Sequence, residues 1–369
     1  MKNFVFSADS HILEPASLYL DNMPASLKQH ALHTRLEDDW LIMGTRVKDI
    51  YRLRLGKNGE RKISAGDRKG VGEIKGRLED MEIEGIDAEI CFPQIGIWMF
   101  ALDDPEAEMA SCQIYNDWNH KFFGDNLNRF VRCGVLPVRD FANTTAELRR
   151  LAALGFTAAM LPGAMPEGVA KYNDEAWDPI FRLAGELGVV FVMHTGTGLQ
   201  SVTSERGPGG AIINYSMQMN DAITSAQYLV AGGVLDRNPQ AKVAFIESGA
   251  SWLTALAERM DEVSVAHAPF VRPKLTRRPS QIIDDQVWAS FQHDRACLLS
   301  TRLPGGRNVM WASDYPHNEG TFPHSRRITE ELFDGIDVGE ETKRDVLGYN
   351  AARLFRFDPV VATSAGGTG

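Results

Sequence analysis

The feature that most constrains the fold is a regular alternation of short apolar runs with longer amphipathic segments. The apolar runs are rich in β-branched, aromatic and small residues, as is typical of strands buried on both faces. They occupy residues 4–8, 88–92, 131–136, 157–161, 189–193, 242–246, 287–291 and 308–311. Segments with helical periodicity lie between them, at residues 105–127, 144–154, 174–187, 215–229 and 250–265. Eight strands that alternate with helices predict a (β/α)8 TIM barrel, with a doubly wound open sheet as the alternative.

One segment interrupts this alternation. Residues 35–75 carry short apolar clusters, such as W-L-I-M and Y-R-L-R-L, between glycines. The pattern predicts a small antiparallel flap inserted after the first strand, with a turn at Asn58-Gly59. We also expect a last helix over 341–355, packed on the outside of the barrel, and a disordered tail over 359–369. Residues 1–358 are therefore predicted to form a single domain.

Net charge and hydropathy exclude two classes of partner. The 369 residues carry a formal net charge of −10, and the pI is near 5.5, whereas proteins that bind nucleic acids or membrane surfaces present basic faces. No apolar run is long enough for a membrane span or a signal-peptide core. We therefore expect a cytoplasmic protein with a small-molecule substrate. Four cysteines without metal-ligand spacing predict reduced, buried thiols at Cys91, Cys112, Cys133 and Cys297.

The first predicted strand ends in a motif that suits a metal ion. Asp9 and His11 follow the run F-V-F-S-A, and side chains two residues apart on an extended segment project to the same side. Glu14 lies three residues further on and can join them from the turn. The motif is also compatible with a purely structural role, in which Asp9 is a turn residue, His11 a hydrogen-bonded core histidine and Glu14 an exposed carboxylate. Its interpretation depends on what the other strands supply.

Polar side chains also follow three of the later strands. The fifth, sixth and eighth strands are followed by His194, by Glu247, and by the pair Asp314 and His317. Functional side chains of a parallel barrel gather at the carboxyl ends of its strands, so we expect these residues to meet the opening motif. Carboxylates packed so densely repel one another unless a cation neutralises them. The sequence therefore predicts a metal site at the barrel mouth.

Several motifs give the chain a resemblance to a known family from Phe4 to about Phe355. They are A-D-S-H-I-L-E-P, R-L-E-D-M-E-I-E-G-I-D, I-Y-N-D-W, H-T-G-T-G, F-I-E-S-G, W-A-S-D-Y-P-H and N-A-A-R-L-F. As a set, they resemble the metal-dependent amidohydrolase-like TIM barrels, in the branch that includes aromatic-acid decarboxylases and related hydrolases. The resemblance implies a metal-dependent enzyme and a homodimer. A subset of this branch is similar to TIM-barrel non-haem di-iron monooxygenases.

The resemblance implies that Asp9, His11, His194 and Asp314 are metal ligands, with two departures from the family pattern. The family's opening His-x-His is Asp9-x-His11 here, and Glu247 stands where the decarboxylases keep an acid/base histidine. With Glu14 and His317 added, the chain offers seven candidate ligands, which suits two ions that share a carboxylate. A mixed histidine and carboxylate set without thiolates suits Fe, Mn or Zn.

These departures lead to a main hypothesis and two alternatives. The main hypothesis is O2-dependent hydroxylation, at a centre of two Fe ions, of a bulky acyl substrate carried on coenzyme A. The phosphates of that carrier would meet a basic run of four residues, Arg272, Lys274, Arg277 and Arg278. The first alternative is a metal-dependent hydrolase or non-oxidative decarboxylase of a small or aromatic carboxylic acid, in which Glu247, Asp314 or His317 moves the proton. The second is a binding or scaffold protein stabilised by its metal.

Overall fold

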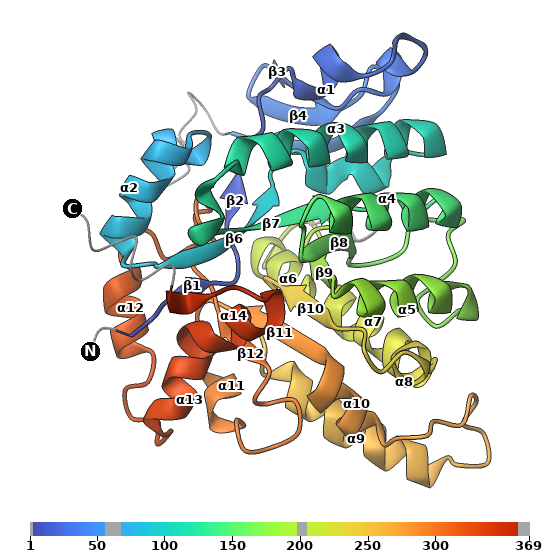
Figure 1. The fold of residues 1–369 in the computed structure, drawn as a ribbon, viewed down its shortest axis with the longest axis vertical. Coiled ribbons are helices and arrows are strands. Elements are labelled where there is room, and N and C mark those ends of the chain that lie inside the picture. Colours follow the sequence, from blue (N-terminus) through green and yellow to red (C-terminus); the bar gives the residue numbers. More distant parts are fainter. Residues whose placement is uncertain (1–2, 56–67, 198–204, 361–369) are drawn as a thin grey trace.

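The fold is a nearly closed parallel barrel surrounded by helices (Figure 1). The computed structural model describes residues 3–55, 68–197 and 205–360. The strands of the barrel follow the order β1-β6-β7-β8-β9-β10-β11-β12, and β2 also pairs with β6. Their bounds are β1 Phe6–Ser7, β2 His11–Ile12, β6 Ala88–Pro93, β7 Phe130–Val135, β8 Ala158–Pro162, β9 Val190–His194, β10 Val243–Ile246, β11 Val287–Phe291 and β12 Val309–Trp311. The predicted (β/α)8 barrel is confirmed, and the open-sheet alternative is wrong.

Main-chain hydrogen bonds join the first and last strands where the barrel closes. The N–H of Ala8 donates to the carbonyl of Trp311 at 3.1 Å, and the N–H of Asp314 donates to the carbonyl of Asp9 at 3.0 Å. The N–H of His11 in turn donates to the carbonyl of Tyr315 at 2.7 Å. The two segments that carry the sequence motifs D-S-H and S-D-Y-P-H are therefore bonded directly to each other. This pairing fixes Asp9 and Asp314 as neighbours.

Helices occupy the predicted segments, with some subdivisions and additions. They are α1 Leu18–Asn22, α2 Ile74–Glu84, α3 Pro105–Phe123, α4 Phe141–Ala153, α5 Asp178–Leu187, α6 Gly210–Met217, α7 Met219–Ala231, α8 Val234–Arg237, α9 Trp252–Ala266, α10 Pro279–Gln286, α11 Arg295–Leu299, α12 Ser325–Glu331, α13 Glu340–Arg344 and α14 Asn350–Phe355. The helix predicted over 215–229 is two helices, α6 and α7, and a π-helical turn (Asp345–Tyr349) divides the last one. Five described helices, α2, α8, α10, α11 and α12, were not predicted.

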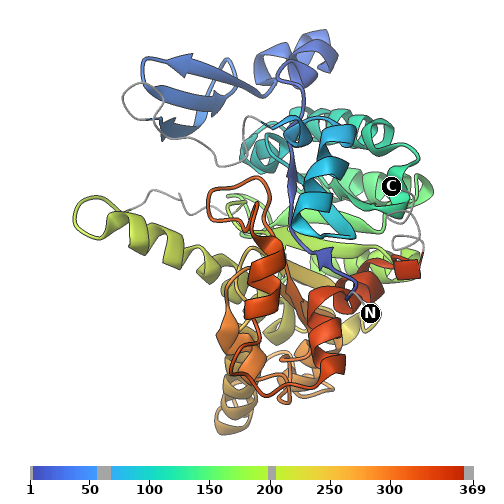
Figure 2. The ribbon, with the colours of Figure 1, turned by 90° about the vertical axis from the view of Figure 1, so that its left-hand side faces the viewer.

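The predicted flap is an antiparallel sheet of three strands, β3 (His33–Glu37), β4 (Trp40–Gly44) and β5 (Asp49–Arg54). The cluster W-L-I-M forms most of β4, and all but the last residue of Y-R-L-R-L belongs to β5. The turn predicted at Asn58-Gly59 and most of the predicted tail lie outside the described residues. The predicted flap extends too far at its carboxyl end, because residues 74 and 75 are the first residues of α2. Figure 2 shows the flap and α6 projecting from the same side of the barrel.

Candidate metal centre

The opening motif brings two polar side chains to the barrel mouth, one from between the short strands β1 and β2 and one from the first residue of β2. Asp9 and His11 are both fully buried, and Asp9 Oδ1 lies 3.6 Å from His11 Nε2. The expectation that both side chains reach one point is met. Parallel pairing of β2 with β6, which places His11 beside Phe92, fixes the depth of the imidazole in the mouth.

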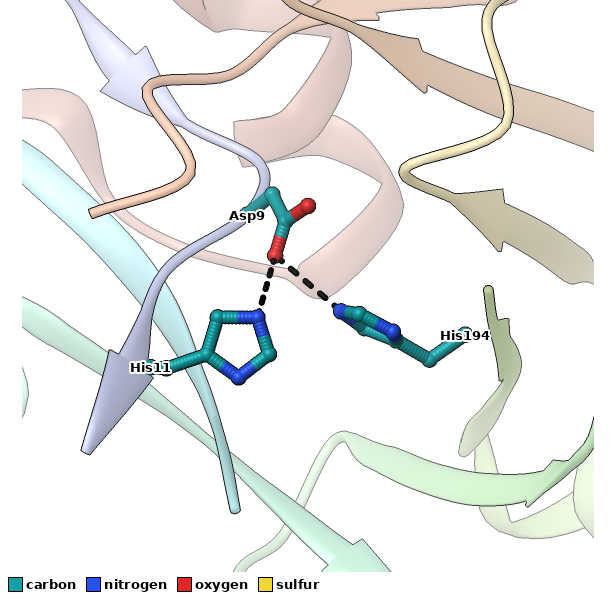
Figure 3. A group of neighbouring side chains, drawn as sticks. All are labelled: Asp9, His11 and His194. Carbon is teal, nitrogen blue, oxygen red and sulfur yellow. Dashed lines mark hydrogen bonds and ion pairs between the residues drawn. The ribbon is translucent and has the colours of Figure 1, made fainter. Parts of the chain in front are cut away.

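His194, the last residue of β9, faces the same point from across the barrel (Figure 3). Its Nε2 atom lies 3.3 Å from Asp9 Oδ1. Its Nδ1 atom lies 2.8 Å from the carbonyl oxygen of Thr195, which can only accept a hydrogen bond. The proton of the neutral ring is therefore held on Nδ1, and the lone pair of Nε2 points toward Asp9 and His11. This is the orientation that a metal-binding histidine requires.

Asp314 and His317 complete the group from the segment after β12. Asp314 Oδ1 lies 3.6 Å from His11 Nε2 and 2.8 Å from His317 Nδ1. Asp314 adopts a left-handed backbone conformation with φ of 53°, which is uncommon for a residue with a β-carbon. This strained backbone turns the carboxylate into the mouth. Asp9, His11, His194, Asp314 and His317 thus converge from three separate parts of the sequence.

Four side-chain atoms in this group are buried without an aligned hydrogen-bond partner. They are Asp9 Oδ2, His11 Nε2, Asp314 Oδ1 and Asp314 Oδ2. A buried polar atom left unpaired costs about 1–3 kcal/mol, and more when it is charged. Oxygen and imidazole nitrogen donors that face one another at this spacing suit a divalent cation. Sets of these ligand atoms, Asp9 with His11 and His194, and His11 with Asp314 and His317, lie within 4.8 Å of one another.

The sixth strand contributes Glu247, directly after β10. Parallel pairing sets Ile246 opposite His194, and Glu247 Oε2 consequently lies 3.7 Å from His194 Nδ1. Glu247 has a left-handed φ of 58°, like Asp314, and its N–H donates to Ser290 Oγ at 3.0 Å. Burial, followed by the charges of Asp314 and Asp9, raises the pKa of Glu247 well above its usual value. A carboxyl in this position retains its proton at a pH where an exposed one is ionised.

Sequence reasoning missed Glu319, which forms a third group with Glu247 and Asp314. Carboxylate oxygens of these residues lie within 4.8 Å of one another, and Glu319 is exposed. It follows the W-A-S-D-Y-P-H motif after one intervening residue, in a loop where neither helical nor strand periodicity marks a position. The acidic side of the mouth is therefore open to solvent at this residue.

Glu14, a predicted metal ligand, is not brought to this group. Its carboxylate is buried but accepts hydrogen bonds from the backbone N–H groups of Gln94, Ile95 and Gly96, at 2.8–3.0 Å. The hydroxyl of Tyr19 donates to it as well, at 3.2 Å. These four donors occupy the lone pairs that a metal ion would need. The structure therefore corrects the expectation that Glu14 is a ligand.

The basic run from Arg272 to Arg278 lies at the opposite end of the barrel. It belongs to the connection between α9 and α10, and α10 leads directly into the first residue of β11. Arg277 is held by Asp236, with Nε 3.1 Å from Oδ1, and by Gln286, with Nη2 2.7 Å from Oε1. The basic run therefore lies at the amino ends of the strands. This corrects the expectation that a substrate at the mouth meets Arg272, Lys274, Arg277 and Arg278.

The ion pair between His317 and Asp314 predicts a pH dependence of stability when a chelator is present. Burial alone would lower the pKa of His317, but the charge of Asp314 raises it to about 9 from the ordinary 6.5. Because the pKa of His317 is higher in the folded state than in the unfolded state, the ion pair contributes its full stabilisation below pH 6.5. This stabilisation is lost as the pH rises through the folded-state pKa of about 9. In EDTA, the denaturation midpoint should therefore fall between pH 6.5 and 9. His317→Gln should flatten this fall in urea titrations followed by circular dichroism. An equally steep fall in that variant would contradict the assignment.

Comparison with known proteins places the chain in a family. A sequence profile described as Amidohydrolase matches residues 30–357. The chain belongs to the amidohydrolase family. One curated relative, 2-amino-3-carboxymuconate-6-semialdehyde decarboxylase from Dictyostelium discoideum, is 25% identical to this amidohydrolase over 297 residues, or 77% of this chain and 76% of the relative.

Solved structures share the fold. 5-Carboxyvanillate decarboxylase from Sphingomonas paucimobilis is similar with a TM-score of 0.71 and 20% identity, over 97% of this chain and 100% of that chain. A dihydroxybenzoic acid decarboxylase from a Polaromonas species was solved with bound manganese and the inhibitor 2-nitroresorcinol. It is similar with a TM-score of 0.65 and 16% identity, over 96% of this chain and 97% of that chain. The likeness at these identities concerns the barrel. No helix in the described part of the chain is long and apolar enough to cross a membrane.

The main hypothesis from the sequence, O2-dependent hydroxylation by a di-iron monooxygenase, is wrong. The curated relative and the two structural neighbours described above are decarboxylases, in agreement with the alternative of a metal-dependent decarboxylase or hydrolase. That hypothesis rests on the number of candidate ligands and on Glu247 as one of them. A carboxyl beside a metal centre can equally move a proton.

Proposed function

We propose that this amidohydrolase is a divalent-metal-dependent, non-oxidative decarboxylase of a small unsaturated or aromatic carboxylic acid. The metal centre is supported by the convergence of buried donor atoms of Asp9, His11 and Asp314 that lack an aligned hydrogen-bond partner. The decarboxylase activity of the curated relative supports the reaction class. The manganese in one structural neighbour makes Mn²⁺ the first ion to test, with Zn²⁺ as the alternative. The homodimer and the cytoplasmic location stay predictions.

The residues that would hold the cation are Asp9, His11, His194 and Asp314, with His317 beside them. A bound divalent cation supplies a Lewis acid that orients the substrate and takes up negative charge. Two carboxylates would offset the formal charge of a divalent ion, and neutral imidazoles would add donor atoms without adding negative charge. The hydrogen bond from His194 Nδ1–H to the Thr195 carbonyl fixes the orientation of the ring and directs the lone pair of Nε2 toward the other ligands.

Glu247 is the residue we assign to proton transfer. In decarboxylation the bond between the ring or alkene carbon and the carboxylate breaks, CO2 leaves, and the electron pair remains on carbon. The neutral carboxyl of Glu247 then donates its proton to that carbon and forms the new C–H bond. The side chain of Glu247 is 16% exposed, so it can recover a proton from solvent for the next turnover.

Replacing Glu247 tests this role. Glu247→Gln removes the transferable proton but keeps the size of the side chain, so we expect kcat to fall about 10²–10⁴-fold, the usual contribution of a general acid. The assay measures CO2 release from a panel of aromatic and unsaturated acids by Mn²⁺-reconstituted protein. Metal content, measured by plasma mass spectrometry, should stay unchanged. Glu319→Gln is the matched control, because it removes an exposed carboxyl from the same group. Unaltered kcat in Glu247→Gln would contradict the assignment.

The open acidic side of the mouth favours hydrolysis as the second candidate. Glu247 and the exposed Glu319 form a group with Asp314 that water can reach, and an ionised Glu247 could accept a proton from an attacking water. The two reactions give different products in H2¹⁸O. Hydrolysis incorporates ¹⁸O into a product carboxylate without CO2 release, whereas decarboxylation in D2O places deuterium on carbon.

A further inference from the structure

Glu14 holds a loop at the barrel mouth. Its carboxylate is almost completely buried, and it accepts the N–H groups of Gln94 and Ile95 at Oε2 and that of Gly96 at Oε1. These residues directly follow β6 and lead into a 3-10 helix, Gly96–Ala101. Charge-assisted bonds to three consecutive N–H groups fix both the path and the rotation of this backbone. The position of the Gln94 side chain therefore depends on Glu14.

Gln94 connects this loop to the candidate metal centre. Its Oε1 atom lies 3.2 Å from His317 Nε2, while His317 Nδ1 lies 2.8 Å from Asp314 Oδ1. The imidazole is thus held at both nitrogens, by a neutral acceptor on one side and by a candidate ligand on the other. The ring also packs against His11, with ring centroids 4.2 Å apart. A rotation of His317 would therefore disturb two members of the centre.

Without a cation, His317 Nδ1–H donates to Asp314 Oδ1, and Nε2–H donates to Gln94. We propose that Gln94 and Glu14 are positioning residues that hold His317, when a cation is bound at the centre, with its proton on Nε2 and its Nδ1 lone pair directed at the cation site. An amide oxygen can only accept a hydrogen bond, so its contact with Nε2 selects the tautomer that carries hydrogen there. Glu14 acts one step further away, through the backbone of 94–96. This inference rests on the proposed function only in taking the same centre as the metal site.

Another buried glutamate supplies a matched control for Glu14. Glu108, on α3, accepts the N–H groups of Val138 and Arg139 at 3.0 Å each, so it also holds the loop that follows a barrel strand. That contact does not lead to the metal centre, because Val138 is apolar and the guanidinium of Arg139 bonds to Leu102 and Asp103. Loss of either carboxylate should disturb a loop, but only loss of Glu14 should reach His317.

The test reads the tautomer of His317 directly. Protein labelled with ¹⁵N-histidine is loaded with Zn²⁺, and long-range ¹H–¹⁵N correlation spectra are assigned with His317→Gln. In the wild type, His317 should carry its proton on Nε2. Gln94→Met, which keeps the side-chain volume but removes the acceptor, should broaden or shift both nitrogen resonances and weaken Zn²⁺ binding about 10–100-fold, as loss of partners of metal ligands does. Gln94→Glu, which keeps an accepting oxygen, should retain the Nε2–H tautomer.

The variants of the two glutamates separate positioning from general stability. Glu14→Gln places an amide against three N–H donors and should change the His317 resonances in the direction of Gln94→Met, whereas Glu108→Gln should not. If Glu14→Gln does not fold, Gln94→Met carries the test, because it leaves the backbone bonds to Glu14 intact. Unchanged resonances and Zn²⁺ affinity in Gln94→Met would overturn the inference, and so would equal effects of Glu14→Gln and Glu108→Gln. Absence of decarboxylation with an intact Nε2–H tautomer would contradict the proposed function instead.

Discussion

Asp314→Asn should leave the protein folded but unable to retain a divalent cation. Both carboxylate oxygens of Asp314 are buried without an aligned hydrogen-bond partner, and Asp314 belongs to two of the three ligand groups at the mouth. Asparagine keeps the shape but has one accepting oxygen and no charge. Loss of a residue that only hydrogen-bonds to a metal ligand weakens metal binding about 10–100-fold. Since Asp314 would itself be a ligand, we expect its loss to weaken Mn²⁺ binding by more than about 100-fold. Decarboxylation should disappear with it.

Calorimetric titration of Mn²⁺ and thermal unfolding measure this effect. The wild type should gain about 2.7 kcal/mol of stability when Mn²⁺ is present at 100 times its dissociation constant. Asp314→Asn should gain almost none at that concentration, and in EDTA it should unfold as cooperatively as the wild type. Glu319→Gln is the control, since the exposed carboxylate can be lost with little change in affinity. Stabilisation of Asp314→Asn by Mn²⁺ to the wild-type extent would show that the cation binds elsewhere.

The barrel and most of its mouth could be predicted because both follow from local patterns. A strand buried on both faces is visible as an apolar run, and parallel strands bring their carboxyl ends together whatever the details of the helices. His194 and Glu247 were therefore found from the residue that follows each run, and Asp314 from the third residue after its run. The left-handed backbone at Glu247 and Asp314 was not predicted, because a positive φ is uncommon for any residue with a β-carbon, including aspartate, in which it is enriched.

The errors concern side chains whose partners are distant in the sequence. Glu14 is bound by N–H groups of 94–96, about eighty residues later, and no local pattern shows whether a carboxylate will meet a cation or a loop. Arg277 was misplaced because α10 (Pro279–Gln286) was not predicted, and that helix determines that the run lies at the amino ends of the strands. The reaction could not be derived either, because a buried glutamate can bind a metal, donate a proton or accept one.

Arg77→Met should cause the largest loss of stability, about 3–5 kcal/mol, which is typical when one partner of a buried ion pair is removed. Arg77, on α2, is 1% exposed, and Glu89, on β6, is fully buried. Arg77 Nε lies 2.6 Å from Glu89 Oε1 and Nη2 lies 3.0 Å from Oε2, so the contact is bidentate. Methionine preserves the apolar stem but leaves the Glu89 charge buried and unpaired. Urea unfolding of protein in EDTA measures the change free of metal linkage.

The double variant Arg77→Met/Glu89→Leu separates the ion pair from a second role of Arg77. Because apolar replacement of a whole buried pair is often close to neutral, the double variant should regain most of the lost stability, and a double variant as unstable as Arg77→Met would contradict this account. The guanidinium of Arg77 also lies 3.7 Å from the ring centroid of Tyr315, whose hydroxyl donates to Asp80 at 2.5 Å. Tyr315 directly follows Asp314, so loss of this contact should loosen the carboxylate in both variants. Mn²⁺ affinity should therefore stay reduced in the double variant after its stability has recovered.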